Sequence, residues 1–137
     1  MSTGRILGWL IVTGYLMTVL NYVVKFVNRK WIMAMPKNAP GRIRYQSFMR
    51  FIVKNHRYFA MFTTAALLTH FVIQYLSWGF YTSGLVAGGL MVLQGALGGY
   101  GTYVKNKKIG PWLYAHRTVA VLLLVGMVIH VLTAKLT

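Results

Sequence analysis

The sequence predicts an all-α integral membrane protein, with four helices in an up-down bundle that forms one domain over residues 1–137. Two observations carry this prediction. The chain is 57% hydrophobic and contains no Asp or Glu. It also contains four long stretches without a charged residue, and each is close to the roughly 20 residues that a helix needs to cross a hydrocarbon core of about 30 Å. Lipid offers no hydrogen bonds to the backbone, so such stretches should be helical.

The four uncharged stretches define the expected membrane spans. They are residues 6–24, 58–78, 80–104 and 118–134. With their apolar flanks, the helices are expected to cover about residues 6–27, 54–78, 80–104 and 113–134. The first stretch is longer than the apolar part of a usual secretory signal, and no small-residue cleavage site follows it. A retained helix is therefore expected there.

The basic residues predict an orientation. Thirteen of the 15 Lys and Arg lie in or beside the connections after the first and third spans, whereas only Arg5 and Lys135 lie on the opposite side. By the positive-inside rule, both basic connections face the cytoplasm and both termini lie outside the cytoplasmic membrane. The first connection, about residues 28–53, alternates basic and apolar residues between 43 and 53. It could form a short interfacial helix or dock an acidic soluble partner.

The net charge of +15 does not by itself indicate a nucleic-acid partner. Basic residues at the ends of membrane helices interact with anionic headgroups, at about 1 kcal/mol each. The lipid bilayer is therefore the expected partner, and nucleic acid is not. The chain has no Cys, which excludes disulfides, Cys-based zinc or iron–sulfur sites and haem attached through a C-x-x-C-H motif.

The four histidines form two pairs with the same spacing. His56 and His70 are 14 residues apart on the second expected span, and His116 and His130 are 14 apart on the fourth. Fourteen residues complete four helical turns to within about 40° and rise about 21 Å. Each pair therefore shares one helix face at two depths. The second and fourth helices run parallel in an up-down bundle, so His56 should lie level with His116, and His70 level with His130.

Two facing imidazoles at each of two depths can clamp two haem irons. The sequence thus predicts two haem b groups between the second and fourth helices. His56 and His116 would bind the iron on the cytoplasmic side, and His70 and His130 the iron on the outer side. A single intramembrane His is often only a hydrogen-bonded packing residue, and His56 and His116 could be interfacial residues. The repeated interval on alternate helices favours the ligand hypothesis.

Two arginines follow the histidines of the cytoplasmic side directly. They are Arg57 and Arg117. A guanidinium group suits carboxylates, and the chain supplies no acidic side chain, so a haem propionate or a lipid phosphate is the expected counter-ion. Anchoring at the membrane edge explains both arginines equally well.

The third span is rich in glycine, and two of its glycines repeat the histidine interval. Gly84 and Gly98 are also 14 residues apart, which makes them candidates for contact with haem. The Gly84-x-x-x-Gly88 and Gly95-x-x-x-Gly99 pairs equally match a common pattern of helix packing. Packing is the more frequent role of such pairs.

With these histidines in place, residues 55–133 resemble the dihaem cytochrome b families. The closest likeness is to the four-helix haem-binding core of the cytochrome b of quinol-oxidising complexes, and the chain is also similar to bacterial b561-type cytochrome subunits of respiratory enzymes. The resemblance implies that His56, His70, His116 and His130 are the axial ligands. The chain lacks the acidic quinol-site motif and the additional helices of the large cytochrome b. It also departs from the ascorbate-linked b561 proteins, whose haems are shared among four helices.

Bis-His ligation fills both axial positions of an iron, so it predicts electron transfer rather than catalysis at the metal. The expected function is transmembrane electron transfer within a respiratory or quinone-linked complex, with other redox subunits and a quinone as candidate partners. The chain is not expected to be a catalyst on its own. The alternative is a haem-free anchor or assembly subunit that holds a soluble enzyme at the membrane. A small transporter is less favoured, because no acidic residue or interrupted helix is present to bind a coupling ion.

Overall fold

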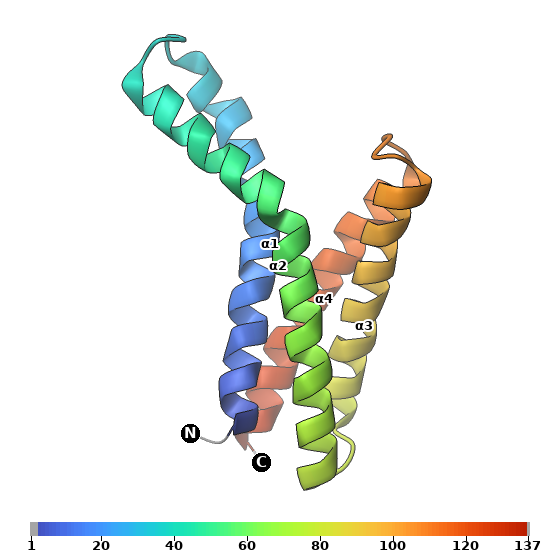
Figure 1. Cartoon of the computed structure of the whole chain (residues 1–137). Helices are drawn as coiled ribbons and strands as arrows, with labels where there is room; N and C mark the ends of the chain where they lie inside the picture. Colours follow the sequence, from blue (N-terminus) through green and yellow to red (C-terminus); the bar gives the residue numbers. More distant parts are fainter. Residues whose placement is uncertain (1–2, 137) are drawn as a thin grey trace. The chain divides into compact units, whose positions relative to one another are not determined.

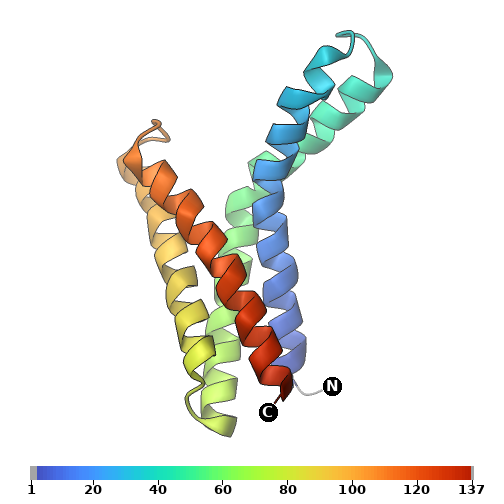
Figure 2. The same ribbon diagram turned by 180° about the vertical axis from the view of Figure 1, so that it is seen from behind.

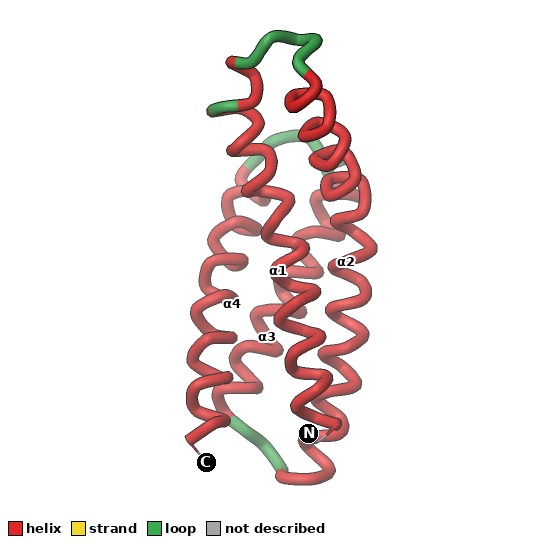
Figure 3. Tube along the Cα trace, turned by 90° about the vertical axis from the view of Figure 1, so that its left-hand side faces the viewer, coloured by secondary structure: helices red, strands yellow, loops and turns green. Residues whose placement is uncertain are grey.

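The computed structural model describes residues 3–136, with side chains up to residue 134, and this part of the chain is almost entirely helical (Figure 3). The four long helices are α1 (Thr3–Lys30), α2 (Pro40–Trp78), α3 (Thr82–Gly99) and α4 (Pro111–Leu136). A short 3₁₀ turn, Ile32–Ala34, follows α1, and a π-helical turn, Tyr100–Val104, continues α3. The described residues contain no strand, so the predicted all-α class is confirmed.

Four helical segments are long and apolar enough to cross a membrane. They are Thr3–Ala34, Pro40–Trp78, Thr82–Val104 and Pro111–Ala134. Large apolar side chains on them face outward, such as Val121, which is 63% exposed, and Leu132, which is 56% exposed. Such a surface is unusual on a soluble monomer but is normal against lipid. These helices indicate a multi-pass membrane protein, in agreement with the four expected spans.

The connection between the first two spans is shorter than the expected residues 28–53. Helix α1 continues to Lys30, and α2 already begins at Pro40. Proline suits the first helical position, where no backbone N–H is needed. Helix α2 has 39 residues, which makes it about 58 Å long. The basic segment that follows Pro40 is therefore part of a continuous helix that is longer than a hydrocarbon core of about 30 Å requires.

The chain divides into two compact units, which we call the hairpin unit and the basic unit. The hairpin unit contains the beginning of the chain up to Gly8 and everything from Thr64 onward, whereas the basic unit is Trp9–Thr63. Each unit therefore holds a part of α1 and a part of α2. Three of the four histidines belong to the hairpin unit.

In the hairpin unit, α3 and α4 lie side by side and antiparallel (Figures 1 and 2). Their shared core contains Ala87 and Met91 from α3 and Leu123 and Met127 from α4, and Leu123 is fully buried. A Cβ atom placed on Gly126 would lie 3.9 Å from the Cα atom of Ala87. The two backbones therefore approach closely through small residues, as membrane helices commonly do.

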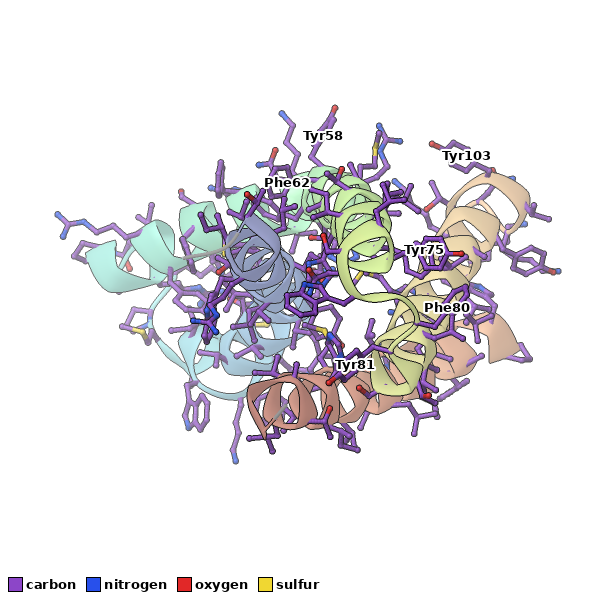
Figure 4. The ribbon with its side chains drawn as sticks, turned by 90° about the horizontal axis from the view of Figure 1, so that it is seen from below. Tyr58, Phe62, Tyr75, Phe80, Tyr81 and Tyr103 are labelled. Atoms are coloured by element: carbon purple, nitrogen blue, oxygen red, sulfur yellow. The ribbon has the colours of Figure 1, made fainter. Side chains whose placement is uncertain are left out.

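Aromatic residues mark the end of the hairpin unit where α2 meets α3. Helix α2 ends at Trp78. The next residue, Gly79, has a φ of 77° that suits glycine, and its N–H donates to the Tyr75 carbonyl oxygen at 2.9 Å. The ring of Phe80 packs on the ring of Tyr75 with centroids 4.6 Å apart (Figure 4). Phe71 stacks on the same Tyr75 ring, with centroids 6.3 Å apart. Aromatic groups of this kind are enriched at membrane–water interfaces.

In the basic unit, α1 packs against the first part of α2. The Tyr45 hydroxyl donates to the Val24 carbonyl oxygen at 3.0 Å, and Val24 and Ile52 are buried. Further along, the Thr63 hydroxyl oxygen lies directly against the backbone of Gly14, where a Cβ atom would collide with it. Glycine at this position therefore permits the close contact.

Candidate functional site

The imidazoles of His70 and His130 are neighbours in the hairpin unit. His70 lies on α2 and His130 on α4, and their ring centroids are 6.5 Å apart with the planes at 82°. Two imidazoles that bind one metal through nitrogen bonds of about 2.0 Å have centroids roughly 6 Å apart. The observed separation is therefore suited to one iron between the two rings, and these are two histidines that the sequence places at one level.

His70 is held by the beginning of α1. Its Nδ1 atom lies 3.0 Å from the carbonyl oxygen of Gly4. A carbonyl oxygen can only accept a hydrogen bond, so Nδ1 must carry the ring proton. In a neutral imidazole, Nε2 then has the free lone pair that a metal needs. Gly8 lies one turn further along α1, where a Cβ atom would be 3.7 Å from Cε1 of the same ring.

His130 is held by the beginning of α3. Its Nδ1 atom lies 3.1 Å from the hydroxyl oxygen of Ser83. The next residue, Gly84, lies against the ring, and a Cβ atom there would be only 3.0 Å from Cε1 of His130. The structure thus gives Gly84 a definite neighbour, the His130 ring, whereas its contact with haem stays a prediction. A larger side chain at position 84 would displace the imidazole.

His116 has a different partner. Its Nε2 atom lies 3.2 Å from the side-chain nitrogen of Gln94 on α3. An amide nitrogen donates, so Nε2 accepts and the ring proton sits on Nδ1. That Nδ1 atom and the Gln94 Oε1 atom are both buried and have no hydrogen-bond partner among the described residues. Gly98 lies against this ring, with a Cβ position 3.4 Å from Cε1 of His116.

Trp112 lies beside His116, with ring centroids 6.3 Å apart. Its indole N–H donates to the Lys108 carbonyl oxygen at 2.8 Å, and its ring lies directly against Gly101 in the π-helical turn. A side chain on Gly101 would collide with the indole, so glycine is required for this contact.

Three predicted site residues remain, namely His56, Arg57 and Arg117. His56 belongs to the basic unit, so its pairing with His116 stays a prediction. The guanidinium group of Arg57 lies over the Tyr58 ring, 5.6 Å from its centroid, as a cation–π pair. Arg117 follows His116 on α4. The role of either arginine toward a haem propionate also stays a prediction.

Three polar residues of the site were not predicted from the sequence. Ser83, Gln94 and Thr133 contact the histidines or one another through hydrogen bonds. A signal existed for Gln94, because an amide in the middle of an apolar span is a functional candidate by default. Nothing in the spacing distinguishes Ser83 or Thr133 from other hydroxyl residues of the spans.

The His70–His130 pair fits a haem iron in the distance between the rings, and His70 offers the lone pair of its Nε2 atom. No three metal-ligating side chains come together in the described part of the chain, but a haem iron needs only two protein ligands because the porphyrin supplies the other four. His116 also has its lone pair on Nε2, but the Gln94 amide nitrogen donates a hydrogen bond to that atom. Haem at His116 therefore requires Gln94 to move away.

Comparison of the chain with protein-family models, with curated proteins and with solved structures gives no match.

Proposed function

We propose that this chain is a membrane cytochrome b that transfers electrons across the cytoplasmic membrane as a subunit of a respiratory or quinone-linked redox complex. One observation carries the proposal: the rings of His70 and His130 lie 6.5 Å apart, and each has a hydrogen-bonded Nδ1 atom. This leaves Nε2 of His70 to bind an iron, and Nε2 of His130 as well when its Nδ1 donates to Ser83. Bis-His ligation without an open position is typical of electron carriers.

A second haem belongs to the other level of the same helices. His116 lies 14 residues before His130 on α4 and has the same glycine contact with α3, which supports an equivalent site there. The proposed partner ligand is His56, and Arg57 and Arg117 would pair with the propionates. Haem, when bound, supplies a reversible one-electron iron couple. The chain's own contribution is to orient the imidazoles and to exclude water from them.

The proposed orientation follows the basic residues. The turn after α3 and the basic unit would face the cytoplasm, among anionic headgroups, and both termini would lie outside. In this arrangement the His116 level is nearer the cytoplasm, and the His70–His130 level is nearer the outer face.

A haem-free anchor or assembly subunit is the second candidate. The hydrogen bond between Gln94 and His116 favours it, because polar side chains that bond across membrane helices also serve as simple packing contacts. In that case the histidines would hold α3 and α4 together and would have no cofactor.

The test is haem quantitation on the full chain, expressed with an adequate haem supply and purified in detergent. The proposal expects two haems per chain, a reduced-minus-oxidised spectrum typical of b-type haem and low-spin electron paramagnetic resonance signals. A stable chain that has no visible absorbance, even after addition of haem, would contradict the proposal and favour the anchor. One haem per chain would limit the proposal to a single level.

A further inference from the structure

Three side chains near the ends of α3 and α4 form a continuous hydrogen-bond chain. His130 Nδ1 lies 3.1 Å from Ser83 Oγ, which lies 3.0 Å from Thr133 Oγ1. Thr133 Oγ1 in turn lies 2.9 Å from the Ile129 carbonyl oxygen and 3.0 Å from the His130 carbonyl oxygen. The proposed function assigns no role to the Thr133 hydroxyl.

The direction of every bond in this chain follows from where the single hydroxyl proton of Thr133 lies. Two carbonyl oxygens of its own helix lie within 3.0 Å of Thr133 Oγ1, and a proton directed to them leaves Thr133 as an acceptor toward Ser83. The Ser83 hydroxyl then donates to Thr133, which uses the only proton of Ser83. In this arrangement His130 Nδ1 donates to Ser83, which puts the proton of the neutral ring on Nδ1 and the lone pair on Nε2.

His70 is held as the same Nδ1–H tautomer by a different partner. Its Nδ1–H donates to the Gly4 carbonyl oxygen on α1. Two unrelated contacts, one from a backbone carbonyl and one from a pair of hydroxyls, thus give the same tautomer to two neighbouring rings. His116 differs, because its Nδ1 atom has no hydrogen-bond partner among the described residues.

We infer that Ser83, Thr133 and the Gly4 carbonyl group are positioning groups, which fix His130 and His70 as Nδ1–H tautomers and present both Nε2 atoms to one metal. That the metal is haem iron rests on the proposed function, whereas the tautomers do not. A hydrogen bond from Nδ1–H also fixes the ring orientation and makes the imidazole a more basic ligand. A more basic ligand favours the oxidised iron, so the contacts lower the reduction potential of this haem.

The tautomers are tested by ¹⁵N nuclear magnetic resonance of the full chain, labelled at histidine and prepared without added haem. The ¹⁵N shifts of an imidazole distinguish the protonated nitrogen from the bare one. We expect His70 and His130 both to be protonated on Nδ1. Thr133→Val removes the acceptor of the Ser83 hydroxyl, which can then donate to His130, so the His130 proton should move to Nε2 while His70 is unchanged.

Thr69→Val is the matched control for Thr133→Val. The Thr69 hydroxyl donates to the Ala65 carbonyl oxygen at 3.1 Å in the same helical manner, next to His70 in sequence. This variant should leave both tautomers unchanged. An Nε2–H signal for His130 in the wild-type chain, or an identical spectrum for Thr133→Val, would overturn the inference.

The consequence for the metal is tested on the haem-loaded chain. Ser83→Ala should weaken haem binding at one site about 10- to 100-fold and raise the midpoint potential of that haem alone, and Ser83→Thr should restore both. Unchanged affinity and potential in Ser83→Ala would overturn the positioning role. A chain that binds no haem but shows both Nδ1–H signals would contradict the proposed function instead, so the two failures are distinguishable.

Discussion

The two histidines of α4 occupy equivalent places but bond through opposite nitrogens. His130 lies against Gly84 and His116 against Gly98, with the same 14-residue interval on both helices. His130 is bonded at Nδ1 by a serine, and His116 is bonded at Nε2 by Gln94. Helical spacing thus places each imidazole against a glycine of α3, whereas the neighbouring polar residue decides which ring nitrogen a metal can reach.

The segment between the two histidines explains why both rings point inward. Leu123 lies seven residues from each, close to two helical turns away, and is fully buried. Around it, α3 and α4 approach through Ala87 and Gly126. With the helices in this register, Gly84 meets the His130 ring and Gly98 meets the His116 ring.

The largest expected effect is the loss of a whole haem at one level. His130→Ala or His70→Ala should each remove one haem per chain and leave the other, since a single imidazole remains at that site. The double variant should lose no more haem than either single one. Pyridine haemochrome quantitation measures this, and retention of both haems in these variants would defeat the ligand assignment.

The next largest effect is steric and should differ between the two levels. A Cβ atom at position 84 would lie 3.0 Å from the His130 ring, against 3.4 Å for position 98 and the His116 ring. Gly84→Ala should therefore displace its imidazole further and lower haem occupancy more than Gly98→Ala. Overpacking of this kind typically costs about 1–3 kcal/mol, which thermal unfolding in detergent can measure.

Gly88→Ala is the control for both glycine variants, because a Cβ atom there would meet nothing within 4 Å. It should leave haem occupancy unchanged and should not lower the unfolding temperature, because alanine favours helix over glycine. Equal losses in Gly84→Ala, Gly98→Ala and Gly88→Ala would show that the glycines do not act through the rings.

A smaller effect, of opposite sign, is expected at Gln94. The Gln94 amide occupies the nitrogen of His116 that would bind iron. Gln94→Leu removes this competing hydrogen bond, which is worth about 0.5–1.5 kcal/mol, so haem affinity at this level should rise roughly 2- to 12-fold. Haem titration of a His70→Ala background isolates the site. A fall in affinity would mean that Gln94 helps to hold the cofactor.

The smallest effect is expected at the arginine beside His116. Arg117→Lys keeps the positive charge, so anchoring at the membrane edge should be unchanged, but the planar group that suits a carboxylate is lost. If Arg117 holds a propionate, haem should dissociate faster, by less than about tenfold. Equal dissociation rates in wild type and variant would assign Arg117 to anchoring alone.

The four helices could be predicted because a long uncharged stretch in lipid must satisfy its own backbone hydrogen bonds, which a helix does. The expected spans of about residues 80–104 and 113–134 lie close to the observed Thr82–Val104 and Pro111–Ala134. The start of α2 was missed, since charges such as Arg42 and Arg44 end the hydropathy signal although arginine favours helix. Hydropathy predicts which part of a helix can lie in lipid, but the helix can continue beyond that part.

Only those features of the candidate site that depend on helical periodicity could be predicted from the sequence. The 14-residue interval led to the neighbouring rings of His70 and His130 and to the two glycines of α3. It could not reveal Ser83, Thr133 or Gln94, because a hydrogen bond between helices depends on side-chain rotamers and on the rotation of each helix. Neither property is encoded in spacing along the chain.

The contact between Gly4 and His70 sets an order of events during biosynthesis. The His70 and His130 rings are held by contacts with residues from the first turns of α1 to the last turns of α4. These residues are separated by nearly the whole sequence. Translation must pass Thr133, and α4 must be inserted, before the two rings and their supports can meet. Capture of the proposed haem at this level would thus occur only after α4 is inserted, and a product truncated before α4 would lack that haem.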